Sequence, residues 1–235
     1  MQKKRLKEIR ESEKKSHIET YTNNELYENG SWLQKPIKTI LELIPFFESY
    51  ERLNILDLGA GVGRNCIPFA VAYQDISCRI ECVDILDLAI ERLESNAKKY
   101  GVDSSINGIL KPLEEYVISE DSYDLIMAIS ALEHIDSETS FFEKLHEICK
   151  GIRRDGIVCL VMNSNVVEKV KETGECISAQ FEVNLSTEDL MNTLESIFVN
   201  WKKLKVTVSK QQYDIPRESG IVELTSDVVT FVARK

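Results

Sequence analysis

Short apolar runs alternate with stretches of helical period between residues 54 and 162, and this alternation restricts the fold more than any other feature. The runs that we expect to form strands are Asn54–Leu58, Arg79–Val83, Ile106–Leu110, Tyr123–Ile129 and Ile157–Met162. The stretches that we expect to form helices are Arg64–Tyr73, Leu86–Tyr100 and Glu138–Cys149. Apolar strands separated by amphipathic helices are typical of βαβ units, whose parallel sheet is covered by helices on both faces. We therefore predict an α/β fold with a doubly wound, mostly parallel sheet.

The segments on either side of this core are also expected to be regular. They are helices over Lys35–Phe47 and Thr187–Phe198, and strands over Leu204–Ser209 and Val228–Ala233. Pro36 near the start of the first helix and Ser186 as the cap of the second support these two predictions. The two strands are joined by Lys210–Asp227, a segment without helical period. Such a direct connection favours an antiparallel strand pair at one edge of the sheet.

Composition and charge limit the partners of the chain. Hydrophobic residues make up 43% and charged residues 29% of the sequence, which is typical of a globular protein that buries a core. The net charge of −10 disfavours nucleic acid as the main partner, because a protein that neutralises phosphates needs a basic face. The first fifteen residues are an exception, with seven basic residues and three glutamates. We favour a solvated helix there over an arm that contacts RNA or an anionic membrane.

Other sequence features point to a reduced, cytoplasmic protein without a membrane segment. No apolar stretch is long enough to cross a bilayer, and the charged N-terminal residues do not resemble a secretory signal. The six cysteines include no CxxC pair and no Cys/His spacing that suits zinc. We therefore expect free thiols and no metal site.

The segment Ile55–Gly63 carries the strongest functional signal. Its loop, Gly59-Ala60-Gly61-Val62-Gly63, follows a predicted buried strand and precedes a predicted helix, so the backbone can turn sharply and approach a ligand closely. A loop of this kind suits NAD, FAD, a phosphate or S-adenosylmethionine, or is a tight turn without a ligand. Asp57 at the strand end would repel a pyrophosphate and favour an ammonium group. The GxGxG spacing also differs from the dinucleotide GxGxxG pattern, and both features favour S-adenosylmethionine.

A second carboxylate follows at the position that an adenosyl ligand needs. Asp84 ends the second predicted strand, and parallel strands of a sheet end at the same edge. A carboxylate at that place can accept hydrogen bonds from both ribose hydroxyls. The alternative for Asp84 is an exposed residue at a strand end.

Taken together, these segments resemble the class I S-adenosylmethionine-dependent methyltransferases. The motifs that carry the resemblance are Ile55–Gly63, Glu81–Asp84, Tyr123–Ile135 and the stretch from Phe142 through Gly156 to Met162. The resemblance implies a Rossmann-like fold with a seven-stranded sheet, one antiparallel strand in its edge region, and methyl transfer to an acceptor. The later part of the chain is more loosely similar to the small-molecule branch that includes tellurite-resistance methyltransferases.

The resemblance also assigns parts of the cofactor to residues of this chain. It places the methionine portion on Asp57, Gly59 and Gly61, with Ala60, Gly63 and Ser130 at the same site, the ribose on Asp84 and the adenine against Ile85. Many family members have an acidic residue after the third strand, where this chain has Lys111-Pro112-Leu113. Adenine recognition is then expected from backbone groups near Pro112 and Leu113. The division that follows is an N-terminal lid over residues 1–50 and a cofactor-binding domain over residues 51–235.

Candidate catalytic residues lie after the fourth strand and in the lid. Glu133 and His134 are possible general bases, although Ser130 to Glu133 also fits a helix capping box and His134 also suits a packed position. Tyr21 is expected to close over the methyl donor, with aromatic packing against the sheet as the alternative. The other two histidines, His17 and His146, are expected to face solvent.

One more segment was a candidate for contact with the acceptor. The predicted loop from Gln211 to Thr225 would present Tyr213 and Arg217 at the cofactor edge, unless it is an ordinary connection. We predict an enzyme that methylates a small-molecule acceptor. The alternatives are a protein or RNA acceptor, a non-catalytic S-adenosylmethionine-binding protein, and a nucleotide-dependent oxidoreductase, which Asp57 disfavours.

Overall fold

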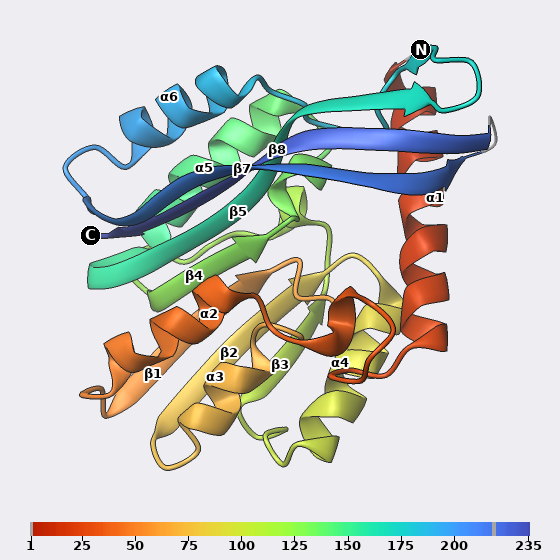
Figure 1. Ribbon diagram of the computed structural model, residues 1–235. Coiled ribbons are helices and arrows are strands. Elements are labelled where there is room, and N and C mark those ends of the chain that lie inside the picture. The colour runs from red at the N-terminus through yellow and green to blue at the C-terminus, as the bar shows by residue number, and fades with distance from the viewer. Residues whose placement is uncertain (1, 218–219) are drawn as a thin grey trace.

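A computed structural model describes residues 2–217 and 220–235, and its centre is a twisted sheet with helices on both faces (Figure 1). The strands are β1 Arg52–Leu58, β2 Ser77–Asp84, β3 Ile106–Leu110, β4 Tyr123–Ile129, β5 Ile152–Val170, β6 Cys176–Ile177, β7 Lys202–Arg217 and β8 Gly220–Arg234. The α-helices are α1 Gln2–Asn23, α2 Lys38–Leu43, α3 Ile67–Ala72, α4 Asp87–Lys99, α5 Glu138–Gly151 and α6 Thr187–Ile197. No helix of the described residues is both long and apolar enough to cross a membrane.

The strand order is β3-β2-β1-β4-β5-β8-β7, with the short β6 paired to β5 outside this path. The strands β1 to β5 run parallel, and β8 runs antiparallel to both of its neighbours, β5 and β7. The α/β class, the parallel sheet and the single antiparallel strand among the seven long strands are therefore confirmed. Because β1 lies next to both β2 and β4, the ends of these three strands form one edge of the sheet.

Alternate residues of the central strands pack against different helices. Ile55 of β1 faces the cluster that contains α3 and α4, whereas its neighbour Leu56 faces the cluster that contains α5 and α6. Both side chains are fully buried. This burial on two faces explains why the strands have continuous apolar sequences. It also fixes β1 and its carboxyl end rigidly between two cores.

Several predicted boundaries need correction. The helix expected over Lys35–Phe47 consists of α2 followed by a 3-10 turn, Ile44–Phe47, because Pro45 cannot donate the backbone hydrogen bond of a continuing α-helix. The helix after the glycine loop begins at Ile67 and not at Arg64. In contrast, β3 and β4 have the predicted bounds, and the Ser186 hydroxyl accepts a hydrogen bond from the Asp189 amide as the predicted cap of α6.

The predicted loop between the last two strands is wrong. β7 and β8 continue far beyond the expected residues as one long hairpin, in which Lys210 pairs with Asp227 and Arg217 pairs with Gly220. Pro216 is compatible with this arrangement because β7 is the outermost strand, where one side needs no partner. β5 is also longer than expected, because its extension pairs with β8 as far as Val170. The hairpin reaches the N-terminal half of α1 (Figure 1).

Candidate cofactor and acceptor site

The glycine loop is held against the end of β2. The amides of Gly59 and Ala60 donate to the carbonyl oxygen of Val83 at 2.8 and 3.1 Å. Gly59, Gly61 and Gly63 all have positive φ values, of 75°, 54° and 91°, which residues with a side chain rarely adopt. The loop also leaves no room for side chains, because a Cβ on Gly59 would lie 2.3 Å from the Cβ of Ala131. The glycines are therefore required by both conformation and space.

Asp57 lies beneath this loop at the end of β1. Its side chain is buried, and burial raises its pKa to about 7, although a hydrogen bond from the Cys66 thiol opposes that shift. Its Oδ2 has no hydrogen-bond partner among the described residues. Cys66, Cys82 and Asp57 bring three potential metal ligands within 4.8 Å of one another. Burial raises the pKa of the Cys82 thiol well above its ordinary value, which disfavours the thiolate that a metal would bind.

Asp84 joins the glycine loop to the second strand end. Its Oδ2 accepts a hydrogen bond from the Gly61 amide at 2.8 Å, and its Oδ1 accepts one from the Leu86 amide at 2.9 Å. Burial raises its pKa, and these backbone amides oppose the shift. A carboxylate oxygen has more than one acceptor site, so both oxygens can still accept hydrogen bonds from a diol. The neighbouring Ile85 is 46% exposed and offers an apolar surface at the same edge.

The other predicted cofactor residues lie at neighbouring strand ends. Leu113 is buried and Pro112 is half-buried, directly after Lys111, whose amide donates to the Asp84 carbonyl oxygen at 2.8 Å. Ser130 is exposed at the end of β4 and has a φ of 51°. All of the predicted cofactor residues therefore follow β1, β2, β3 or β4 at one edge of the sheet.

The predicted capping box at Ser130 is wrong. Residues Leu132–His134 form a 3-10 turn without a side-chain cap, and the turn follows Ala131. Glu133 Oε1 instead accepts hydrogen bonds from the backbone amide and the side-chain amide of Asn163, at 3.0 and 2.8 Å. These two hydrogen bonds connect the segment after β4 to β5, and they take the place of the predicted local cap. Glu133 also lines a cavity of about 10 Å³ on the side of α5 and α6, which suits one water molecule.

The N-terminal helix α1 covers the strand ends with one face. Glu13, His17 and Tyr21 are spaced by four residues, so they lie in one row along the helix. Tyr21 is 4% exposed, and its hydroxyl lies 2.8 Å from the position that a Cβ on Gly61 would occupy. Its ring is 6.1 Å from that of Trp32. The predicted place of Tyr21 above the glycine loop is therefore present, while its role stays a prediction.

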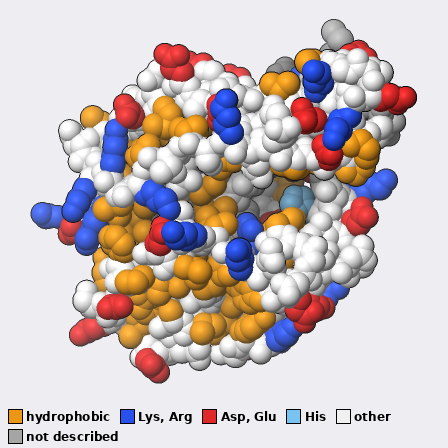
Figure 2. All heavy atoms as spheres, viewed as in Figure 1, with side chains coloured by type: hydrophobic (Ala, Val, Ile, Leu, Met, Phe, Trp, Pro, Cys, Tyr) orange, Lys and Arg blue, Asp and Glu red, His pale blue; other side chains and the backbone are white. Residues whose placement is uncertain are grey.

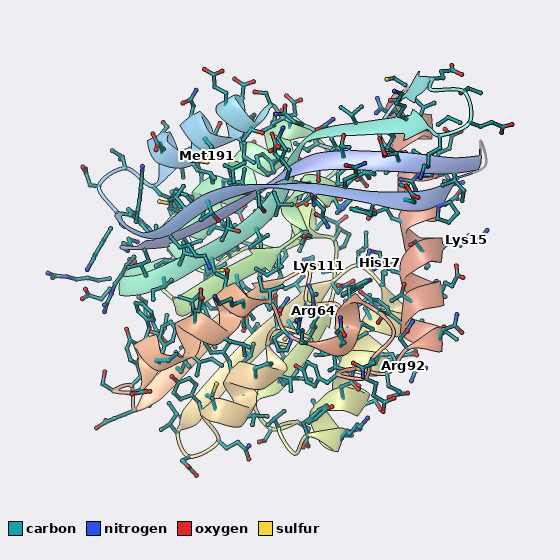
Figure 3. All side chains as sticks on the ribbon, in the orientation of Figure 1. Lys15, His17, Arg64, Arg92, Lys111 and Met191 are labelled. Atoms are coloured by element: carbon teal, nitrogen blue, oxygen red, sulfur yellow. The ribbon has the colours of Figure 1, made fainter. Side chains whose placement is uncertain are left out.

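His17, expected in solvent, instead belongs to this site. It is half-buried, its ring lies 5.5 Å from that of Tyr21, and its Nδ1 is buried without a partner among the described residues. Burial, with a smaller effect of the His134 charge, lowers its pKa to about 4, so the ring is neutral. A hollow beside α1 exposes a histidine in Figure 2, and Figure 3 identifies His17 there, with Lys111 and Arg64 nearby. The third histidine, His146, is exposed as expected.

His134 has a different environment, which disfavours the predicted role as a base. Its Nδ1 lies 2.9 Å from Glu182 Oε2 and 3.2 Å from Glu13 Oε2. Burial opposes its charge, but the hydrogen bond to Glu182 and the charge of Glu13 raise its pKa to about 9. The ring is thus a cation at neutral pH that connects α1 to the segment before α6. Arg10 adds to this connection through Glu182 at 3.7 Å, and it also joins α1 to Glu114 in the turn after β3 at 2.6 Å.

We expect the stability contributed by His134 to decrease as pH rises. A histidine whose pKa is about 9 in the folded state and 6.5 ordinarily stabilises the fold fully below pH 6.5 and loses that contribution through pH 9. His134→Gln should therefore lower the free energy of unfolding by up to about 3 kcal/mol more at pH 6.5 than at pH 10. Urea denaturation at both pH values measures this difference. His146→Gln is the control, and an equal effect of His134→Gln at both pH values would contradict the assignment.

Arg217 and Tyr213 do not lie in a loop. Both belong to β7, and the Arg217 guanidinium donates to both carboxylate oxygens of the buried Glu168 at 2.8 and 3.1 Å. A third contact, of 3.4 Å, joins Arg217 to the Ser12 hydroxyl of α1. Arg217 therefore holds the hairpin against β5 and α1. Tyr213 remains 40% exposed on the same strand.

The comparisons with known proteins agree with this site. Residues 55–151 match the family model of a methyltransferase domain, which spans the glycine loop, Asp84 and the end of β4. A malonyl-[acyl-carrier protein] O-methyltransferase of Ilyobacter polytropus is 28% identical over 124 residues, which are 52% of this chain and 43% of that protein. The chain thus spans less than half the length of this curated relative.

Solved structures resemble the chain over most of its length. The YcgJ protein from Bacillus subtilis has a TM-score of 0.58 at 14% identity, covering 84% of this chain and 97% of its own. TehB from Haemophilus influenzae has a TM-score of 0.59 at 15% identity, covering 83% of this chain and 61% of its own. Residues 55–151 therefore match a methyltransferase domain, and the chain shares its fold with these solved structures. A further structure with this fold is a geranyl diphosphate methyltransferase in complex with S-adenosylmethionine, with a TM-score of 0.56 at 13% identity, covering 83% of this chain and 84% of its own.

Proposed function

We propose that the chain transfers a methyl group from S-adenosylmethionine to a small-molecule acceptor by in-line displacement. The observation that carries this proposal is the buried Asp57 carboxylate, whose Oδ2 has no partner among the described residues. A buried carboxylate with one unpaired oxygen beside a glycine loop is complementary to the ammonium group of the cofactor and repels a pyrophosphate. Bound S-adenosylmethionine supplies an activated sulfonium methyl group, so the protein has to orient an acceptor and exclude water.

The predicted residues would divide the cofactor among them. Asp57 and the loop residues Gly59, Ala60, Gly61 and Gly63 would hold the methionine portion, together with Ser130. Asp84 would accept hydrogen bonds from the ribose hydroxyls, and its two backbone contacts keep its carboxylate oriented. Ile85, Pro112 and Leu113 would form the adenine pocket.

On the acceptor side, residues 1–50 would act as the lid. Tyr21 would close over the methyl donor, because its hydroxyl already lies above Gly61. His17 is neutral, and its Nδ1 has no partner in the described part of the chain, so with the proton on Nε2 this nitrogen can accept a hydrogen bond from an acceptor hydroxyl or amine. The charge on His134 makes it a positioning residue for α1, and the contacts of Glu133 with Asn163 favour a structural role.

Support for a small acceptor comes from the cover that α1 forms over the strand ends. A macromolecular acceptor would have to displace this helix and its ion pairs to Glu114 and Glu182. Because the Ilyobacter polytropus relative is a malonyl-[acyl-carrier protein] O-methyltransferase, carboxylic acids belong in the set of acceptors to test. The net charge of −10 is also unfavourable for an RNA acceptor.

Binding and turnover test the proposal separately. Calorimetry should show S-adenosylmethionine and S-adenosylhomocysteine binding to the wild type, and at least about a tenfold weaker affinity for Asp84→Ala, which loses charge-assisted hydrogen bonds. Transfer of a radiolabelled methyl group would then be measured with carboxylic acids, phenols, amines and thiols. A folded wild-type protein that binds neither ligand would refute the proposal. Binding without turnover on any acceptor class would favour a non-catalytic protein.

A further inference from the structure

We infer that Arg64 binds the carboxylate at the amino-acid end of the cofactor, while Asp57 binds its ammonium group. This inference rests on the proposed function and adds a residue that no sequence motif assigned. It implies that the site distinguishes a zwitterionic amino-acid end from a simple amine or an uncharged end.

The position of Arg64 is fixed by the loop and by the N-terminal segment. It follows Gly63 directly, and its carbonyl oxygen accepts a hydrogen bond from the Tyr27 hydroxyl at 2.8 Å. Its guanidinium lies over the Trp32 ring, 4.7 Å from the ring centre, and one terminal nitrogen donates to the Trp32 carbonyl oxygen at 3.1 Å. One end of the planar group is thus held by Trp32. The labelled Arg64 lies near the centre of the view, with the labelled Lys111 and His17 close to it (Figure 3).

The other side of the guanidinium lacks a partner. The Arg64 Nε is buried and makes no hydrogen bond to any described residue. Burial lowers the pKa of Arg64, and the charges of Tyr21 and Asp57 oppose that effect. A buried N–H group of a guanidinium without an acceptor is unfavourable, so it is expected to find one when a ligand is present.

Asp57 has the opposite charge, and it also has a side-chain atom that lacks a hydrogen-bond partner among the described residues. Its Oδ2 is also buried without a partner, and Arg64 affects the pKa of Asp57 through its charge. Nevertheless, no hydrogen bond or ion pair between the two side chains exists in the described part of the chain. Two buried, opposite charges that do not contact each other leave a donor and an acceptor for a third group. A group that carries both an ammonium and a carboxylate satisfies the two residues at once.

Tyr21 covers the glycine loop next to Asp57 and Arg64. The Tyr21 hydroxyl lies 2.8 Å from the position of a Cβ on Gly61, so a ligand end that lies against the loop requires this flexible side chain to move. Planar bidentate recognition of a carboxylate is a typical role of arginine, whereas lysine offers a single point charge. A purely structural role for Arg64 would need only its contact with Trp32, and the following test separates the two roles.

The test compares three ligands that differ only at the amino-acid end. They are S-adenosylhomocysteine, its decarboxylated analogue S-adenosyl-3-thiopropylamine, and 5′-methylthioadenosine, which lacks both charged groups. We expect Arg64→Met to weaken S-adenosylhomocysteine binding by about 10- to 100-fold, the range for a hydrogen bond to a charged group. Binding of the other two ligands should change by less than about threefold, because they carry no carboxylate. Arg64→Lys should restore part of the loss.

Controls make each outcome decisive. Lys111→Met removes another cation near the hollow beside α1 and should leave the ratio of affinities for the three ligands unchanged. An equal loss for all three ligands in Arg64→Met would assign Arg64 a structural role and overturn the inference. An unchanged affinity for S-adenosylhomocysteine would overturn it as well. If the folded wild type binds none of the three ligands, the proposed function itself fails, which is a different result.

Discussion

Gly59→Ala is expected to lower the free energy of unfolding by about 2–5 kcal/mol and to prevent cofactor binding. Gly59 has a φ of 75°, which adds strain of roughly 1–2 kcal/mol to a residue with a Cβ. The new Cβ would also lie 2.3 Å from the Cβ of Ala131, so one of the two strand ends has to move. Such overpacking typically lowers the free energy of unfolding by about a further 1–3 kcal/mol. Urea denaturation and titration with S-adenosylhomocysteine measure the two effects.

Two further variants separate strain from collision. Gly101 has a similar φ of 69°, but a Cβ there would meet nothing within 4 Å, so Gly101→Ala reports the strain alone. Adding Ala131→Gly to Gly59→Ala removes the colliding atom and should recover the steric part of the loss. If Gly59→Ala is no more destabilising than Gly101→Ala, the close approach of Ala131 is not a constraint. A double variant as unstable as Gly59→Ala would lead to the same conclusion.

Asp57→Asn should stabilise the ligand-free protein and weaken its cofactor binding. Burial raises the pKa of Asp57 from 3.8 to about 7, so the fold is less stable at pH 8 than it would be with an uncharged residue. Each pKa unit corresponds to 1.36 kcal/mol, which sets an upper limit of about 4 kcal/mol on the gain. The sign follows from linkage: the penalty is absent below pH 3.8, grows as pH rises to about 7 and stays constant above it. The same substitution removes the partner of the cofactor ammonium group.

Stability measurements at two pH values test this trade-off. The free energy of unfolding of Asp57→Asn should exceed that of the wild type at pH 8, and the excess should shrink at pH 4.5. Asp124 is a matched control, because it is also buried but accepts a 2.7 Å hydrogen bond from the Asn54 amide and faces Arg153. Asp124→Asn should therefore destabilise the protein. A loss of stability for Asp57→Asn at pH 8 would show that its carboxylate is already compensated.

Much of the fold follows from local sequence pattern, and the remainder depends on long-range contacts. The bounds of β4 follow from its sequence because the strand is buried on both faces and needs apolar residues on each, whereas β3 has its predicted bounds as a partly exposed edge strand. The hairpin between β7 and β8 was missed, because its mostly exposed β7 has no alternating polarity. Its strand pairs join residues that are far apart in the chain, such as Lys210 with Asp227 and Lys202 with Arg234.

The residues of the candidate site also divide into those that local sequence pattern predicts and those that depend on long-range contacts. Asp57 and Asp84 could be predicted because strand ends meet at one edge of a parallel sheet. Arg64 and His17 could not, because their roles depend on α1 and Trp32 crossing the loop, and α1 has too few apolar residues to show which face is buried. The capping box failed because a tertiary contact, from Glu133 to Asn163, replaced the local hydrogen bond.

The way in which α1 is attached determines which part of the molecule opens first. Among the described side chains of this helix, the buried apolar ones are Ile9 and Tyr21. Its other contacts are made mainly by charged or polar groups, such as Arg10 with Glu114 and Glu13 with His134. Segments with few buried apolar contacts open at lower free energy than the core to which they are attached. The helix is therefore expected to form a cooperative unit of its own, so that ligands can enter and leave while the sheet stays folded.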